Sequence, residues 1–111
     1  MPTKNRTLGA ELILTNTTVY TTPPRFESNV DSIIISNASS SSVKFSLDWY
    51  DSKLATYYTL AEQVTMYPNS ILQLTDGFIL QPNDTIRGLA SIANVITVIV
   101  KVKEEYLTST I

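Results

Sequence analysis

Hydrophobic and polar residues alternate along several short stretches of this chain. From Ile96 to Val102 every second residue is apolar, and the residues between them include Thr97 and Lys101. The stretch VKFSLDWY (residues 43–50) alternates in the same way, with Trp49 among its apolar positions. Successive side chains of a β-strand point to opposite faces, so a period of two indicates strands with one buried face. Both stretches are therefore predicted to be strands, and Trp49 is expected to point into the core.

Turn-forming residues divide the rest of the chain into further short strands. The stretch VDSIIIS (residues 30–36) is rich in β-branched residues, which is typical of a strand at the centre of a sheet. Pro23 and Pro24 cannot donate backbone hydrogen bonds, so they mark a loop or an edge. Asp76 and Gly77 tolerate positive φ and predict a tight hairpin between the strands that flank them. The remaining strands are predicted at residues 10–14, 19–22, 55–60, 71–74, 78–80 and 85–90.

These strands together predict the fold class. Eight or nine short strands, separated by turns and without helical periodicity, are typical of an all-β, antiparallel β-sandwich or jelly roll. The 111 residues are enough for one domain with its own core. We expect a polar N-terminal arm over residues 1–9, the sandwich over residues 10–106 and a C-terminal tail over residues 107–111.

Composition narrows the possible functions. The chain has no cysteine and no histidine, so disulfides, thiolate metal sites, the usual zinc ligand and the usual general base are all missing. The net charge is −2 and the eight basic residues are scattered along the chain, which argues against nucleic acid as a partner. No apolar run approaches about 20 residues, and the polar N-terminus lacks the apolar region of an export signal. We therefore expect no membrane partner, no metal or other cofactor, and no enzymatic activity.

One group of acidic and aromatic residues has two interpretations. Asp48 and Asp51 flank Trp49 and Tyr50, and an aromatic ring next to carboxylates is able to stack on a sugar and bind its hydroxyl groups. The alternation of residues 43–50 instead places Trp49 in the core, and it favours this second interpretation.

Other acidic residues also fit structural roles better than chemical ones. Asp76, Asn83 and Asp84 offer oxygen ligands of the kind that calcium prefers. They lack the regular spacing of a calcium loop, and aspartate and asparagine are common turn formers, so we interpret them as turn residues. Glu104 and Glu105 are neighbours near the chain end and would point to opposite faces of a strand. We expect them at a solvated strand end and not as a catalytic pair.

The tyrosines and the two chain ends are the best candidates for contacts with other proteins. Six tyrosines and one tryptophan occur in a small chain with few charges, and aromatic side chains are enriched at protein interfaces. The alternative is that Tyr57 or Tyr58 only covers the sheet. The polar arm and the short tail are natural clasps onto neighbouring subunits. The candidate contact residues are Lys4, Arg6, Thr7, Tyr57, Tyr67, Tyr106 and Leu107.

The order of these segments resembles that of small β-sandwich virion structural proteins of tailed bacteriophages. The resemblance runs from about Leu12 to Val102 and rests on TNTTVYTTP, VDSIIISNASSSSVKFSLDWYDS, YYTLAEQVTMYPNS and LQL…FILQPNDTIRGLAS, followed by a valine-rich strand. These segments match a pattern of turns and alternation and contain no catalytic signature. The family's usual glycine in the last turn is Asn83 here, a residue that also adopts the left-handed conformation.

The resemblance implies a non-enzymatic virion component that is made in the host cytoplasm. Proteins of this kind decorate capsids as cement proteins, or occur in necks, tails, baseplates and fibres, often as homotrimers. It implies capsid decoration first, with the major capsid protein or other virion proteins as partners, and one of the other virion positions as the alternative. A carbohydrate-binding β-sandwich module is a second alternative, which requires exposed aromatic residues on one face.

Overall fold

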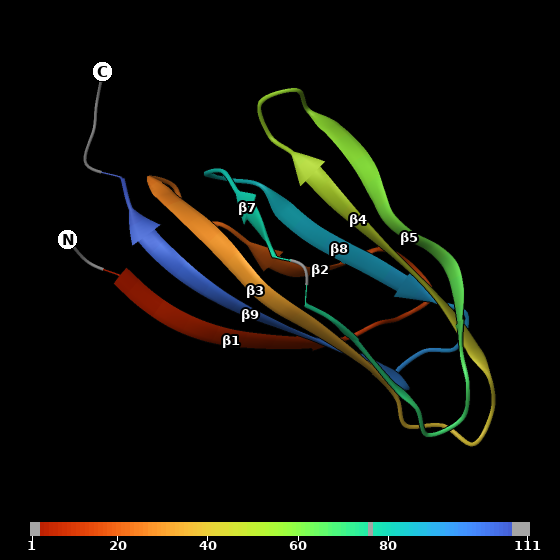
Figure 1. Cartoon of the computed structure of the whole chain (residues 1–111). Helices are drawn as coiled ribbons and strands as arrows, with labels where there is room; N and C mark the ends of the chain where they lie inside the picture. Colours follow the sequence, from red (N-terminus) through yellow and green to blue (C-terminus); the bar gives the residue numbers. More distant parts are fainter. Residues whose placement is uncertain (1–2, 76, 108–111) are drawn as a thin grey trace.

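The computed structural model describes residues 3–75 and 77–107, which form nine β-strands in two sheets packed face to face (Figure 1). All strand pairs are antiparallel. The predicted all-β, antiparallel sandwich is therefore confirmed. Within the described ranges, no helix is long and apolar enough to cross a membrane. The strands are β1 (Thr3–Glu11), β2 (Thr17–Thr21), β3 (Phe26–Asn37), β4 (Val43–Asp51), β5 (Thr56–Met66), β6 (Ile71–Leu74), β7 (Phe78–Leu80), β8 (Thr85–Ala90) and β9 (Ile96–Tyr106).

The order of the strands is that of a jelly roll. The first sheet contains β1, β9 and β3 in this order, with both β6 and β7 paired to the free side of β3. The second sheet has the order β2, β8, β4, β5. Because β6 and β7 follow one another along β3, they act as one interrupted edge strand. The eight resulting strand positions are connected as in a double Greek key, and consecutive positions lie in different sheets except for β4 and β5, which pair with each other.

The hydrophobic core lies between the two sheets. Val98, Val100 and Val102 of β9 face it, as the alternation predicts, and Phe45 of β4 faces it from the second sheet. Trp49 continues the inward face of β4 and packs against this core, but it is only half-buried. Trp49 therefore lies at the margin of the core.

Residues 3–11 form a strand, so the expectation of a polar arm over residues 1–9 is wrong for the part that the structure describes. β1 begins at Thr3 and pairs with β9 over its full length. Leu8 and Ala10 on its inward face pack against the core. An edge strand is held mainly by backbone hydrogen bonds, which do not depend on the polarity of the side chains. The strand predicted at residues 10–14 ends at Glu11 instead.

The predicted hairpin at Asp76 and Gly77 is also wrong. β6 pairs with β3 over Ile71–Leu74 and β7 pairs with it over Phe78–Leu80, so the chain continues in one direction along β3. Asp76 itself lies outside the described residues. A β-carbon on Gly77 would lie 2.6 Å from the carbonyl oxygen of Val30. The close approach of these two backbones explains why a glycine stands here.

β5 continues to Met66, well beyond the end predicted at Leu60. Its pairing with β4 shifts register twice, and each shift leaves an extra residue on β5. Such bulges interrupt the regular alternation of side chains. The sequence pattern therefore predicts a connection where the structure continues the strand.

Candidate interaction surfaces

Five of the predicted contact residues lie on the first sheet: Lys4, Tyr106 and Leu107 at the corner where β1 begins and β9 ends, and Arg6 and Thr7 near the middle of β1. Lys4 and Thr7 are exposed on β1, whereas Arg6 directs its guanidinium towards a buried carboxylate. Tyr106 is the last residue of β9, and Leu107 follows it with an exposed side chain. The remaining predicted tail, residues 108–111, lies outside the described residues.

The other two predicted residues lie at opposite ends of β5. Tyr67 follows the strand and is 70% exposed. Tyr57 packs against Tyr50 with ring centroids 4.7 Å apart, and the guanidinium carbon of Arg87 lies 3.4 Å from the Tyr57 ring centroid. Arg87 in turn forms an ion pair with Asp48, with 3.3 Å between Nε of Arg87 and Oδ2 of Asp48. The structure therefore does not bring all seven predicted residues onto one surface.

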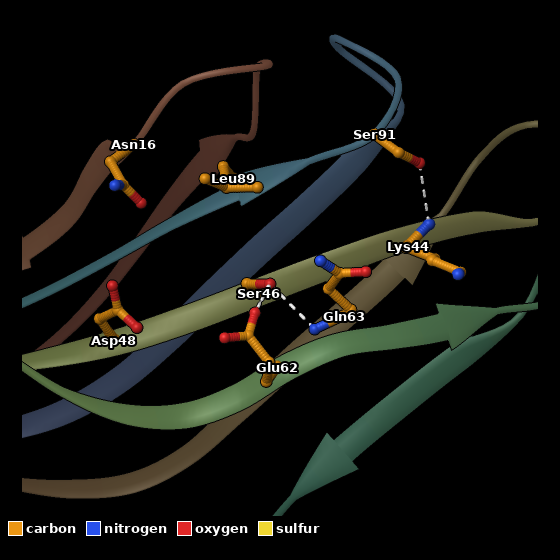
Figure 2. A pocket seen from close by; sticks show the side chains of 8 residues that line it. All are labelled: Asn16, Lys44, Ser46, Asp48, Glu62, Gln63, Leu89 and Ser91. Atoms are coloured by element: carbon orange, nitrogen blue, oxygen red, sulfur yellow. Dashed lines mark hydrogen bonds between the residues drawn. The ribbon is translucent and has the colours of Figure 1, made fainter.

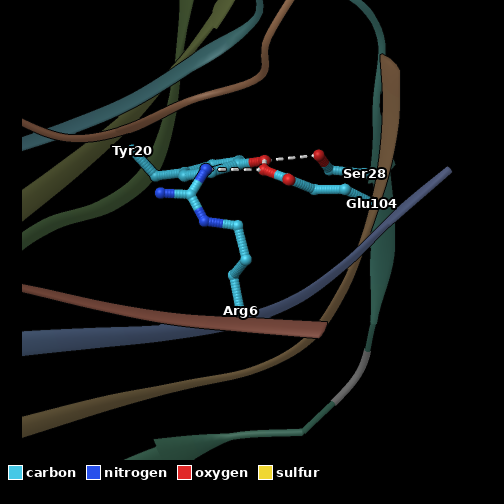
Figure 3. A network of polar contacts seen from close by, with 4 residues as sticks. All are labelled: Arg6, Tyr20, Ser28 and Glu104. Carbon is cyan, nitrogen blue, oxygen red and sulfur yellow. Dashed lines mark hydrogen bonds and ion pairs between the residues drawn. The ribbon is translucent and has the colours of Figure 1, made fainter. Parts of the chain in front are cut away.

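Glu104 forms a buried polar cluster between the sheets (Figure 3). It is only 1% exposed, and its Oε2 accepts hydrogen bonds from the Tyr20 hydroxyl and from Nη1 of Arg6, the latter at 3.1 Å. The Tyr20 hydroxyl also shares a hydrogen bond with Ser28. Burial, together with the hydrogen bond to the Glu104 carboxylate, raises the pKa of Tyr20 to about 12. A buried charge is tolerated when it is paired and hydrogen-bonded, as this one is.

The location of Glu104 differs from the one expected from the sequence. Glu104 and Glu105 do point to opposite faces of β9, but Glu104 lies in the interior and not at a solvated strand end. The cluster joins β1 and β2 to β9, so its evident role is to hold the N-terminal strand in place.

Exposed apolar side chains gather on one lateral side of the sandwich. Of the twelve large hydrophobic side chains that are exposed in the described residues, six lie on the edge strands β5, β6 and β7, whereas the opposite edges β1 and β2 expose none. We call this surface the apolar side. Its members are Tyr57, Tyr58, Leu60, Ile71, Leu74 and Ile79.

The apolar side contains a groove where the edges of the two sheets meet. Trp49 and Leu60 line it from the second sheet, Phe78 and Ile79 line it from the first, and its volume is about 320 Å³. Tyr58 stacks on Trp49 with ring centroids 5.2 Å apart, which extends the apolar surface along β5. Unpaired strand edges and apolar patches of this kind are typical of interaction surfaces.

A second, polar groove lies on the outer face of the second sheet and has a volume of about 400 Å³ (Figure 2). It runs across β8, β4 and β5, and a residue preceding β2 closes one side. Its lining contains carboxylates, amides, hydroxyl groups, one ammonium group and one leucine. The residues are Asn16, Lys44, Ser46, Asp48, Glu62, Gln63, Leu89 and Ser91.

Asp84 organises the turn that precedes β8. Its carboxylate accepts hydrogen bonds from the backbone and hydroxyl of Ser52, from the Gln81 N–H and from Nε1 of Trp49. Asn83 has a φ of 68°, the left-handed conformation expected of it. The interpretation of these two residues as turn formers is confirmed. Across the described ranges, no group of three or more metal-ligating side chains is found.

Neither groove was predicted from the sequence. One signal for the apolar side was present, because Tyr57 and Tyr58 are adjacent on a strand and cannot both face the core. The polar groove gave no comparable signal. It depends on a bulge that places Glu62 and Gln63 opposite Ser46, and pairing register is not visible in the local sequence.

Comparisons with known proteins identify similar folds but no family. No protein-family model matches the chain, and no curated protein matches its sequence. Among solved structures, the chain is similar to a protein of Bacillus endospore appendages, which form a novel family of disulfide-linked pili. The TM-score is 0.57 at 10% identity, over 96% of this chain and 88% of that one.

The chain is also similar to a protein of the IBDV viral particle. The TM-score is 0.55 at 6% identity, over 96% of this chain but only 36% of the viral one. Both proteins are similar to this chain in fold. At these identities the likeness extends to the fold alone, and the disulfide linkage of the pili has no counterpart here because the sequence contains no cysteine.

Proposed function

We propose that this chain is a non-enzymatic structural protein of a bacteriophage virion, and that it decorates the capsid by bridging neighbouring major capsid subunits. The observation that carries this proposal is the apolar side, which is an exposed surface suited to contacts with other protein chains. The order of sequence segments that resembles phage virion proteins supports it. A virion is accordingly the proposed location.

The two structural neighbours support a role in a large assembly. One is a protein of a viral particle and the other belongs to a family that forms pili. Jelly rolls are frequent in viral capsids. In repeated assemblies, contacts that are individually weak add up because each subunit is bound at several points.

We further propose that three copies associate through their apolar sides. Leu60 and Ile79, at 40% and 50% exposure, are the side chains that such a contact would bury. The polar edge of β1 with Lys4 and Thr7, and Tyr106 at the end of β9, would then remain free to contact the major capsid protein. Nucleic acid and membranes have no place in this proposal.

The position in the particle is tested by cryo-electron microscopy of the virion that contains this chain. Density at local threefold or quasi-threefold axes of the capsid is the expected result. Density confined to one vertex, the neck, the tail or the fibres would overturn capsid decoration in favour of the alternative virion roles. Absence from every particle would overturn the virion proposal.

The association of copies is tested separately on the purified chain by light scattering coupled to size-exclusion chromatography. The expected mass is three times the 12.3 kDa of one chain. Ile79→Lys places a charge on the apolar side and is expected to give monomers, because a buried unpaired charge opposes association. Thr7→Lys, on the exposed face of β1, is the matched control and should leave the mass unchanged. A wild-type monomer would contradict the proposed trimer.

A further inference from the structure

The polar groove on the outer face of the second sheet is built around a bulge in β5. Leu47 pairs with Ala61 and Phe45 pairs with Val64, so Ser46 alone lies opposite the two residues Glu62 and Gln63. Two residues opposite one is the definition of a β-bulge, and bulges often re-aim side chains at functional sites. Here the bulge directs both a carboxylate and an amide towards the same groove (Figure 2).

Ser46 fixes the conformation of this bulge. Its hydroxyl accepts the backbone N–H of Gln63 at 2.9 Å and donates to Oε1 of Glu62 at 3.0 Å. Gln63 has a φ of 47°, in the left-handed region that non-glycine residues seldom occupy. Such a conformation costs about 1 kcal/mol or more and is found preferentially at functional sites.

The groove offers both hydrogen-bond donors and acceptors at close range. Lys44 and the side-chain amides of Asn16 and Gln63 donate, whereas Asp48, Glu62 and the same amides accept. The Lys44 ammonium takes part in neither of the two ion pairs found in the described residues. The Lys44 ammonium therefore remains open to a ligand.

The mixture of groups indicates a ligand with many hydroxyl groups and no net charge. Asp48 is already paired with Arg87, and the remaining charged groups of the lining are one carboxylate, Glu62, and one ammonium, Lys44, so their formal charges cancel. Leu89 provides an apolar contact of the kind that the C–H face of a sugar ring can use. The volume of about 400 Å³ lies within the range of small-molecule sites.

We propose that this groove binds a saccharide, with Glu62 and Gln63 as the side chains that hydrogen-bond its hydroxyl groups. The site is distinct from the one suggested by the sequence, where Trp49 would stack on the sugar, because Trp49 lies on the inward face of β4. None of the eight residues that line this groove belongs to the apolar side, so the proposal does not depend on the oligomer or on the position in a virion.

The test is a nuclear magnetic resonance titration of the ¹⁵N-labelled full chain. The probes are the methyl glycosides of glucose, galactose and mannose, together with N-acetylglucosamine, and glycerol serves as a non-sugar polyol. We expect at least one saccharide to cause saturable shifts of the backbone amides of Ser46, Gln63 and Ser91. Glycerol should not cause them.

Two variants connect these shifts to the proposed side chains. Glu62→Gln keeps an acceptor for Ser46, and Gln63→Gly removes the amide while tolerating the left-handed backbone, so the bulge is preserved. The double variant is expected to weaken binding by about tenfold or more. Glu105→Gln, on the exposed face of β9, is the control and should bind as the wild type does.

Three results would overturn the proposal. The groove amides could fail to shift with every saccharide, they could shift equally with glycerol, or the double variant could bind unchanged while its spectrum shows a folded chain. Saturable shifts of the same amides by purified major capsid protein, without any by saccharides, would make the groove a protein contact instead.

Discussion

At the scale of single residues, Glu104 is the side chain whose environment is most demanding. It is a carboxylate inside a β-sandwich, on the same face of β9 as three buried valines. Its charge is compensated by Arg6, which is partly exposed, and by the Tyr20 hydroxyl. Desolvating a carboxylate without such partners costs several kcal/mol, so the three residues depend on one another.

Glu104→Ala is expected to lower the free energy of unfolding by about 2 to 3 kcal/mol, because it leaves the Arg6 guanidinium without its carboxylate and the buried Tyr20 hydroxyl without its acceptor. Urea denaturation followed by Trp49 fluorescence measures this loss. Glu105→Ala, one residue further on the exposed face, is the control and should change stability by less than about 0.5 kcal/mol. Equal losses in both variants would show that the buried network does not stabilise the fold.

Because of Tyr20, the free energy of unfolding is expected to depend on pH in the alkaline range. Its pKa is raised from 10.0 to about 12 in the folded chain, first by burial and then by the Glu104 carboxylate. The neutral phenol is therefore favoured by folding, and its contribution is complete below pH 10 and lost as the pH rises to about 12. The expected loss over this window is about 2 to 3 kcal/mol.

Urea denaturation of the wild type and of Tyr20→Phe, at about pH 9 and about pH 11.5, tests this dependence. Tyr20→Phe should be less stable than the wild type at the lower pH, because it loses the bonds to Glu104 and Ser28. The difference in the free energy of unfolding between the wild type and Tyr20→Phe should be smaller at the higher pH. A constant difference would mean that Tyr20 ionises as freely in the folded chain as in the unfolded one.

At the scale of single elements, two glycines in strands differ in what surrounds them. A β-carbon on Gly88 of β8 would lie 2.7 Å from the carbonyl oxygen of Ser46 and 2.7 Å from a methyl carbon of Leu47. A β-carbon on Gly9 of β1 would meet nothing closer than 3.7 Å. Gly88 is therefore required by the close packing of β8 against β4, and Gly9 is not required by space.

Gly88→Ala is expected to destabilise the chain by about 1 to 3 kcal/mol, since the backbone of β4 cannot move aside as a flexible side chain would. Gly9→Ala should be neutral or slightly stabilising, because alanine restricts the unfolded chain without a clash. Thermal unfolding of the two variants provides the comparison. A Gly88→Ala variant as stable as Gly9→Ala would show that the two strands separate more easily than their contacts indicate.

The elements also show which parts of the fold the sequence is able to predict. β4 and β9 alternate regularly because one face of each is buried, and both were predictable. β1 was not, because only Leu8 and Ala10 among its residues carry the pattern and the strand is held by its backbone pairing with β9. The turn at Asn83 was predictable from local conformation. The path of β6 and β7 was not, because it depends on their common partner β3.

At the scale of the whole molecule, the two long sides of the sandwich have opposite character. One side carries the edges of β1 and β2, with exposed polar groups such as Lys4 and Thr18. The other carries β5, β6 and β7 with six exposed large hydrophobic side chains. Charged edge strands discourage pairing between sheets, so the polar side is protected and the apolar side is not. This difference could not be predicted from the sequence, since it requires knowing which strands lie at the edges.

The neighbouring positions of β1 and β9 also have a practical consequence. Thr3 lies opposite Glu105 in the ladder, so the two ends of the described chain leave the sandwich at the same corner, on the opposite side of the first sheet from β6 and β7 (Figure 1). A short linker is therefore able to join them in a circular permutant whose new ends open elsewhere. For the same reason, a fluorescent or affinity label attached at Thr3 or Leu107 would start from the side of the first sheet that lies away from β6 and β7.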